Sequence, residues 1–342
     1  MVNGAPGVTV SSNTKLFWGS FIALVATAFA FMLRVQLMGT WEQEFALTKT
    51  QAGTIFGAGF WPFGVSIVLF SMVLDRVGYR KAMVFAFCCH VLFAVMTIFA
   101  DGYWMLYWGS VIGALAAGTV EAVINPLIAT IYKENKTTWL NILHAGWPGG
   151  LVVTGIVVIF MSGSVPWEYQ IGLILVPTAI YGFMMLTSHF PVSERVAAGV
   201  SYREMLAEMG WGGAFIVSLM IVMELTANVL GIQGLRNIYI QVVIAGVFAA
   251  VFGSYTRSFG RPVFVFLLVV MLLLATTELG TDSWVKDLLG PSMKSAFSSI
   301  DDPSRWVLVY TAAIMMVLRF VCGPIIERLK PLGVLAASAL TV

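Results

Sequence analysis

The stretch FSMVLDRVGYRK, residues 70–81, marks the point where a long apolar run ends in a compact charged turn. Five residues define this turn: Asp75, Arg76, Gly78, Arg80 and Lys81. A simple basic flank of a membrane segment explains the three cations but not the aspartate or the glycine. Glycine permits a tight turn because it adopts backbone angles that other residues avoid. We therefore predict a specific polar turn, in which Asp75 meets helix N-termini and basic side chains.

A similar arrangement recurs near the end of the chain, in FVCGPIIERLKPLG, residues 320–333. Here Gly323, Glu327 and Arg328 follow another apolar run, and roughly 240 to 250 residues separate the two copies. Two parallel repeats, related by an axis normal to the membrane, are one recurrent plan of transporters. The sequence therefore predicts two related helical bundles.

Composition restricts the class of protein. Of the 342 residues, 59% are hydrophobic and only 11% are charged, whereas a soluble domain carries roughly 25% charged residues. This indicates an integral, multi-pass membrane protein that has the lipid bilayer as a partner. The net charge of +2 gives no reason to expect nucleic acid. The three cysteines have neither disulfide nor metal-ligand spacing, so we predict no cofactor and no metal.

A spanning helix needs about 20 mostly apolar residues. Ten runs satisfy this rule and predict an all-α fold: 15–38, 51–73, 82–100, 103–131, 138–162, 167–187, 211–231, 238–256, 262–284 and 305–326. An eleventh run, PLGVLAASALTV (331–342), is too short to cross the bilayer. We therefore expect the start of another span, and a second bundle that is incomplete in this chain.

The distribution of Lys and Arg predicts the topology. With a cytoplasmic N-terminus, the inner segments carry twelve of these residues and the outer loops carry five, as the positive-inside rule requires. We predict the cell (inner or plasma) membrane as the location. The predicted parts are a cytoplasmic N-terminus, a first six-helix bundle, a cytoplasmic linker, an inserted helix pair and the beginning of a second bundle: 1–14, 15–187, 188–210, 211–256 and 257–342.

The turn DRVGYRK resembles the signature loop of the major facilitator superfamily, and the second copy strengthens the resemblance. Ser71 stands where the family's first glycine is usual, and Lys330 stands where a later glycine would fall in the second copy. The resemblance covers nearly the whole chain and implies a two-bundle transporter fold. It also implies that the two turns form a cytoplasmic gate, which closes in one state and opens in the other.

The stretch GTVEAVINPLIA, residues 118–129, puts a carboxylate near the centre of an apolar run. A charge at mid-bilayer costs about 2.5–3.5 kcal/mol on insertion scales, and such residues usually face a cavity or a partner. Burial favours the neutral form of a carboxyl group, so Glu121 can be charged or neutral as its access to water changes. Asn125 lies one turn later on the same face, and Pro126 frees a backbone carbonyl.

The next span contains LNILHAGWPGG, residues 140–150, in which Asn141 and His144 share a helical face. Together with Glu121 and Asn125 it resembles the fucose/galactose/glucose–proton symporter (L-fucose permease-like) branch of the superfamily. The resemblance implies that Glu121 couples protons and that both asparagines contact the solute. His144 is a departure, since glutamine is expected there. Arg34 and Gln36 occupy the helix in which the branch carries an acidic residue.

Other polar residues within spans have two readings each. Glu278, Asp282 and Trp284 either face the solute cavity, or mark the membrane–water boundary, where tryptophan is enriched. Arg34 either binds the solute or extends to the outer membrane surface, and Arg319 is expected to extend to the inner one. Glu121 could instead be permanently paired with Arg34 or His144, and His144 could be a core histidine.

The sequence thus favours a secondary active transporter, with proton-coupled symport of a small polar solute such as a sugar by alternating access. A proton or sodium gradient is the expected driving force, and a monomer is the expected oligomeric state. A non-transporting sensor or binding protein with a carrier fold is one alternative. A carrier of a carboxylate or a drug-like solute with different coupling is another. An enzyme is not expected, because the three histidines form no metal-binding pair and no nucleophile motif is present.

Overall fold

The computed structural model describes residues 10–192, 194–300, 302–321 and 333, and in these ranges the regular structure is helical. The first half contains nine helices: α1 (Val10–Glu44), α2 (Lys49–Ala58), α3 (Trp61–Val77), α4 (Tyr79–Ile98), α5 (Tyr103–Ile131), α6 (Lys136–Leu143), α7 (Gly146–Met161), α8 (Trp167–Gly172) and α9 (Leu175–Leu186). The second half contains α10 (Glu194–Ala197), α11 (Tyr202–Glu224), a π-helical turn (Leu225–Val229), a 3-10 turn (Gln233–Arg236), α12 (Ile238–Thr256), α13 (Pro262–Ala296) and α14 (Arg305–Val321).

Nine segments within the described ranges are long and apolar enough to cross a membrane. The described part of α14, with 17 residues, corresponds to the tenth predicted span. The prediction of an all-α, multi-pass membrane protein is therefore confirmed. The predicted start of an eleventh span lies outside the described residues, apart from residue 333.

Three predicted spans are each built from two helices. The breaks fall at Gly59–Phe60, His144–Ala145 and Leu173–Ile174. At the first break the Gly59 and Phe60 amides donate to the carbonyls of Phe56 and Gly57, both at 2.9 Å. Such short i→i−3 bonds tighten the helix into a local 3-10 turn, so the chain bends without losing its backbone hydrogen bonds.

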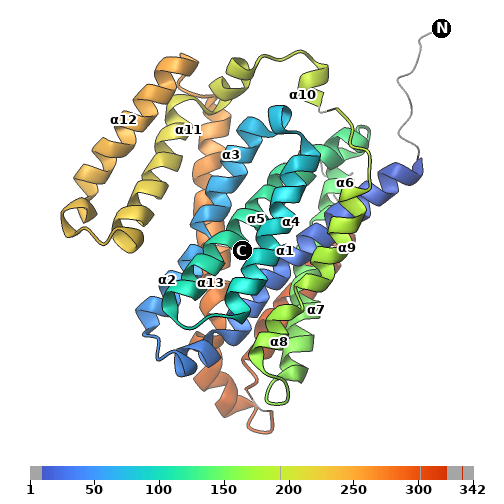
Figure 1. The fold of residues 1–342 in the computed structure, drawn as a ribbon, viewed down its shortest axis with the longest axis vertical. Coiled ribbons are helices and arrows are strands. Elements are labelled where there is room, and N and C mark those ends of the chain that lie inside the picture. The colour runs from blue at the N-terminus through green and yellow to red at the C-terminus, as the bar shows by residue number, and fades with distance from the viewer. Residues whose placement is uncertain (1–9, 193, 301, 322–332, 334–342) are drawn as a thin grey trace.

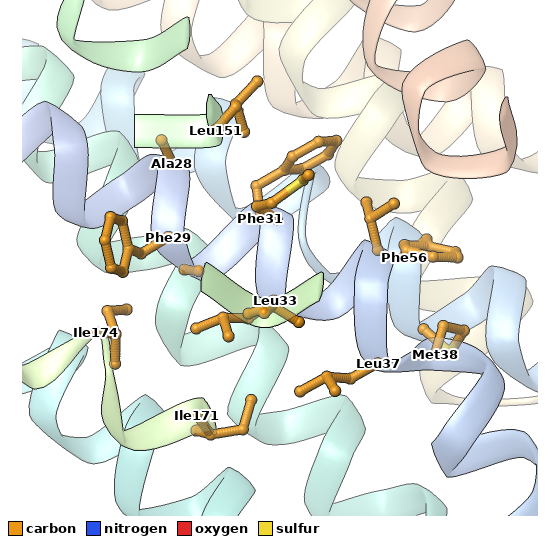
Figure 2. Close-up of a cluster of buried hydrophobic side chains, with 14 of the residues drawn as sticks. Ala28, Phe29, Phe31, Leu33, Leu37, Met38, Phe56, Leu151, Ile171 and Ile174 are labelled. Atoms are coloured by element: carbon orange, nitrogen blue, oxygen red, sulfur yellow. The ribbon is translucent and has the colours of Figure 1, made fainter. Parts of the chain in front are cut away.

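The first helix forms the centre of the structure. α1 packs against α5, α7 and α9, and its apolar side chains contribute to two buried clusters. Figure 2 shows part of one cluster, with Phe29 and Leu33 of α1 facing Ile174 and Ile171 of the α8–α9 segment. α1 reaches Glu44, six residues beyond the predicted end of the first span, because polar residues after Gln36 lower the hydropathy but do not stop the helix.

Glycines in α5 allow its close packing against neighbouring helices. A Cβ atom at Gly118 would lie 2.3 Å from the Phe63 carbonyl oxygen of α3, and one at Gly113 would lie 2.9 Å from the Phe93 ring of α4. Ser66 of α3 donates to the Leu115 carbonyl of α5 at 2.8 Å. This packing fixes α5, the helix that carries Glu121, within the bundle.

Helices α11 and α12 form a hairpin at one side of the bundle (Figure 1). Its connection to α13 is tight, because a Cβ atom at Gly210 would lie 2.1 Å from the Gly260 nitrogen, and Gly210 has a φ of 52°. The Trp211 amide donates to the Ser258 carbonyl at 2.9 Å, and the Arg261 amide donates to the Glu208 carbonyl at 2.9 Å. The second half of the predicted linker, 202–209, is thus a helix held against the α12–α13 turn.

Candidate functional site

Three predicted site residues form one hydrogen-bonded chain within the first bundle. Asn125 Nδ2 donates to the Glu121 carboxylate at 2.8 Å and to the Glu121 carbonyl at 2.9 Å. His144 Nε2 lies 2.9 Å from Asn125 Oδ1. An amide oxygen only accepts hydrogen bonds, so His144 Nε2 must carry a hydrogen and donate. The side-chain amide of Asn125 therefore bridges Glu121 and His144 by hydrogen bonds.

The position of His144 follows from the break in its span. His144 is the residue that ends α6, and α7 begins two residues later at Gly146. Its ring thus extends toward α5 from a point at which the helix is interrupted. Glu121, Asn125 and His144 are all only half-buried. Interrupted helices near the bilayer midplane are a recurrent feature of solute sites in transporters.

The chain of polar groups continues toward α14. Asn141 Nδ2, one turn before His144, donates to the Arg319 carbonyl at 2.5 Å. The Arg319 guanidinium interacts electrostatically with the carboxylates of Glu278 and Glu121. Its Nε is buried and has no hydrogen-bond partner among the described residues. Arg319 is half-buried near the end of the described part of α14, and its guanidinium interacts with carboxylates of both halves of the chain. Its extension to the inner membrane surface stays a prediction.

Of the other residues predicted on α13, Glu278 and Asp282 lie one turn apart and interact electrostatically, whereas Trp284 contacts a different helix. Glu278 is exposed and Asp282 is half-buried. Trp284 contacts α2, where its ring centroid lies 5.6 Å from that of Phe56, and a Cβ atom at Gly53 would lie 3.4 Å from it. Trp284 thus joins α13 to the first bundle, and the three residues form no common cluster in the described structure.

Arg34 and Gln36, two residues apart on α1, have different surroundings. Gln36 is bonded twice to Arg305 at the start of α14: Arg305 Nε donates to Gln36 Oε1 at 2.8 Å, and Gln36 Nε2 donates to the Arg305 carbonyl at 3.1 Å. Arg34 is 4% exposed, and among the described residues no carboxylate oxygen lies within 4.0 Å of its guanidinium. The alternative in which Glu121 pairs directly with Arg34 is therefore excluded for this conformation.

A cavity of about 640 Å³ opens at the predicted outer end, where α1 and α13 end. Gln36, Lys286 and Arg305 line it together with the 162–167 loop, whereas Glu121, Asn125 and His144 do not. Lys286 donates to the Gln36 carbonyl at 3.4 Å and lies 3.8 Å from Asp302. Through these contacts and those of Arg305 with Gln36, the two halves of the chain meet beside the cavity.

The predicted gate residues of the first copy lie at the opposite end. Gly78 joins α3 to α4 with a φ of 84°, a conformation that favours glycine. The Arg76 guanidinium lies 4.1 Å from the centroid of the Tyr202 ring of α11, and Arg80 donates to the Ser188 carbonyl at 2.8 Å. Asp75 also has a partner in the structure. The second-copy residues Gly323, Glu327 and Arg328 lie outside the described residues.

Sequence reasoning gave no site role to Arg305, Lys286 or Arg319. The first two stand at the ends of predicted spans, where basic residues are ordinary. Lys286 and Arg305 both contact Gln36, from which they are 250 and 269 residues away in the sequence. The internal repeat predicted two related bundles, but it did not indicate which residues of the two would be in contact.

The comparisons with known proteins agree with this architecture. The sequence model of the Major Facilitator Superfamily matches residues 17–342. Relatives include a gentisate transporter of Corynebacterium glutamicum, 22% identical over 47% of this chain and 37% of its own length. A D-xylose transporter of Levilactobacillus brevis is 22% identical over 48% of this chain and 35% of its own length. A TsgA homolog of Buchnera aphidicola is 22% identical over 54% of this chain and 48% of its own length.

The chain therefore spans about a third to a half of the length of these curated relatives. Among solved structures, it is similar to a bacterial homolog of the human lysosomal transporter Spinster, in an inward-facing and unoccupied conformation. That match has a TM-score of 0.44 and 12% identity, and covers 92% of this chain and 98% of the other.

Proposed function

The chain belongs to the Major Facilitator Superfamily, and from this membership we propose that it is a secondary active transporter, a proton-coupled symporter of a small polar organic solute. The solute site lies between the two halves of the chain, and alternating access exposes it to one side at a time. We place the N-terminus in the cytoplasm and the protein in the cell membrane. One relative is named for D-xylose and another for gentisate, and a sugar is the solute that the sequence favours.

The observation that carries this proposal is the row of hydrogen bonds from Glu121 through Asn125 to His144. Ionisable residues inside membrane spans mark ion and substrate pathways. An ionised Glu121 accepts the hydrogen bond from Asn125, whereas a protonated Glu121 no longer carries the charge that strengthens this bond. Gaining or losing one proton therefore changes how firmly Asn125 is held, and with it the position of His144.

Contacts with Arg319 connect these hydrogen-bonded residues to α14, in the second half of the polypeptide. Asn141 reaches across to α14 by its bond to the Arg319 carbonyl, and the Arg319 guanidinium interacts with Glu121. Protonation of Glu121 removes one of the negative charges near Arg319. This weakens the attraction between the two halves of the chain, so proton binding favours a rearrangement of α14 relative to α5 and α6.

The test is solute-driven proton entry into proteoliposomes that contain the purified protein and an internal pH dye. A panel of solutes, with D-xylose and L-fucose among them, is added to wild type, to Glu121→Gln and to the control Glu134→Gln, which changes an exposed loop carboxylate. We expect entry in wild type and the control, and solute exchange without proton entry in Glu121→Gln. Equal proton entry in all three proteins would refute the coupling role, and solute binding without flux would indicate a sensor instead.

A further inference from the structure

Arg34 is buried far from either end of its helix. It precedes the end of α1 at Glu44 by ten residues, a rise of about 15 Å along the helix axis. Only 4% of the residue is exposed. A cation that extends to the membrane surface leaves its charged head in water, and this one does not. The charge of Arg34 is therefore held inside the protein.

Nothing described in the structure neutralises this charge. Arg34 Nε and Nη1 are buried and have no hydrogen-bond partner among the described residues. A guanidinium stays protonated in proteins, and an unpaired buried ion costs several kcal/mol. A compensating anion is the missing element.

Arg319, a half-buried arginine, shows what compensation looks like in the same molecule. Arg319 interacts with the carboxylates of Glu121 and Glu278, whereas Arg34 has no such neighbour among the described residues. The two cations therefore differ in kind. Arg319 belongs to an internal network of charges, and Arg34 is available to a negatively charged group from outside the chain.

Gly59, at a helix break, makes room for the Arg34 guanidinium itself. A Cβ atom at Gly59 would lie 2.6 Å from Arg34 Nη2 and 2.8 Å from Cζ. Any larger residue would displace the guanidinium. Gly59 also ends α2, so the planar face of Arg34 lies at the point where the second span bends.

Aromatic rings surround the face of α1 that carries Arg34. Phe31, three residues earlier, lies on the same helical face. Its ring centroid is 6.0 Å from that of Phe60 and 5.6 Å from that of Trp147. Phe60 and Trp147 are only half-buried, so their rings can offer contact area to a ligand. A cation next to flat apolar surfaces suits a compact organic anion.

We propose that Arg34 binds the carboxylate of the transported solute, which makes the substrate class a small organic anion with an apolar or ring-shaped body. This inference rests on the proposed transport function, whose solute it specifies. A carboxylate matches the fork of a guanidinium and forms two parallel hydrogen bonds with it. The unpartnered Nε and Nη1 donors of Arg34 then gain acceptors. The rings of Phe60 and Trp147 contact the body of the solute.

The experiment measures ligand-induced thermal stabilisation of the purified full-length protein, since a ligand that binds the native state raises the Tm. The probes are two matched pairs that differ by a carboxylate: D-glucuronate with D-glucose, and benzoate with benzyl alcohol. The proteins are wild type, Arg34→Met, Gly59→Ala and the control Arg236→Met, which removes an exposed cation. Truncating one partner of a buried charge pair weakens binding by roughly 30-fold or more.

We expect at least one carboxylate, and neither neutral partner, to stabilise wild type and Arg236→Met. Arg34→Met and Gly59→Ala should lose that response. Without ligand, Arg34→Met should be at least as stable as wild type, because it removes an uncompensated buried charge. A lower Tm for unliganded Arg34→Met, a carboxylate response that persists in this variant, an equal response to neutral solutes, or no response to either carboxylate would each overturn the inference.

The same proteins separate this inference from the transport proposal. Glu121→Gln should keep the Arg34-dependent carboxylate response even though it loses proton entry. Carboxylate binding without any proton entry in wild type would overturn the transport proposal alone. Proton entry driven by a neutral sugar, without carboxylate binding, would overturn the assignment of Arg34 alone.

Discussion

Replacement of Gln36 by leucine should open the predicted outer end of the protein. Gln36 is 3% exposed and joins α1 to α14 by two hydrogen bonds with Arg305, at 2.8 and 3.1 Å. One of the two is donated by a charged group and contributes about 1.5–3 kcal/mol, and the neutral one contributes about 0.5–1.5 kcal/mol. Leucine has a similar size and supports neither bond.

The sum, about 2–4.5 kcal/mol, corresponds to a roughly 30- to 1,600-fold change in the ratio of open to closed states. Lys49 provides the matched control, because it also joins the two halves, through Asp287 at 2.6 Å, but its side chain is 65% exposed. Exposed ion pairs contribute about 0.2–1 kcal/mol. Lys49→Ala should therefore change the ratio by no more than about fivefold.

Pulsed electron–electron double resonance would measure the change in the distance between α1 and α13, with nitroxides at the exposed positions Gln43 and Leu289. The labels are attached in a background without native cysteines, and the protein is held in nanodiscs. Gln36→Leu should add a population with a longer distance that wild type and Lys49→Ala do not show. Superimposable distributions for wild type and Gln36→Leu, or a larger change in Lys49→Ala, would refute the reasoning.

Three further substitutions test other parts of the structure. Asn125→Leu removes the bridge between two titratable groups, so solute-driven proton entry into proteoliposomes should fall at least tenfold; a wild-type rate would show that the bridge is not used. Gly118→Ala should lower the unfolding temperature in detergent, because overpacking costs about 1–3 kcal/mol, whereas Gly64→Ala meets no atom within 4 Å; equal temperatures would contradict the packing described. Gly210→Ala should speed proteolysis of the 188–210 segment, unlike Gly246→Ala, which also meets open space; unchanged cleavage of the first variant would show that the junction tolerates a side chain.

The membrane architecture could be predicted because it depends on composition over about 20 residues at a time. Each of the ten predicted spans contains helix in its described part. The polar residues Glu121, Asn125 and His144 do lie together. The helix break at Gly59 was not predicted, because the apolar pattern continues through it, although Gly59 at the end of α2 and Pro62 at the start of α3 are typical boundary signals. It depends on a local 3-10 turn that leaves room for Arg34.

The roles of the cations were harder to predict than the positions of the helices. Hydropathy placed the end of the first span at residue 38, which left Arg34 within one turn of the membrane surface. The helix in fact continues to Glu44, and Arg34 is only 4% exposed within the protein. The partner of Gln36 is Arg305, 269 residues away, and no local pattern contains that information.

The junction at Gly210 changes what the connection between the two halves can do. Backbone hydrogen bonds join residues 208–212 of α11 to the turn before α13, and Tyr202, in the first turn of α11, receives the Arg76 guanidinium from the last turn of α3. A flexible linker would let the two halves of the chain move apart without breaking any contact. A rigid connector instead makes any displacement of α13 pull on one cation–π contact, worth about 0.5–1 kcal/mol at an exposed site. Under the proposed alternating access, this contact is weak enough to break in each cycle, and residues 208–212, which are bonded to the turn before α13, connect it to the second half of the chain.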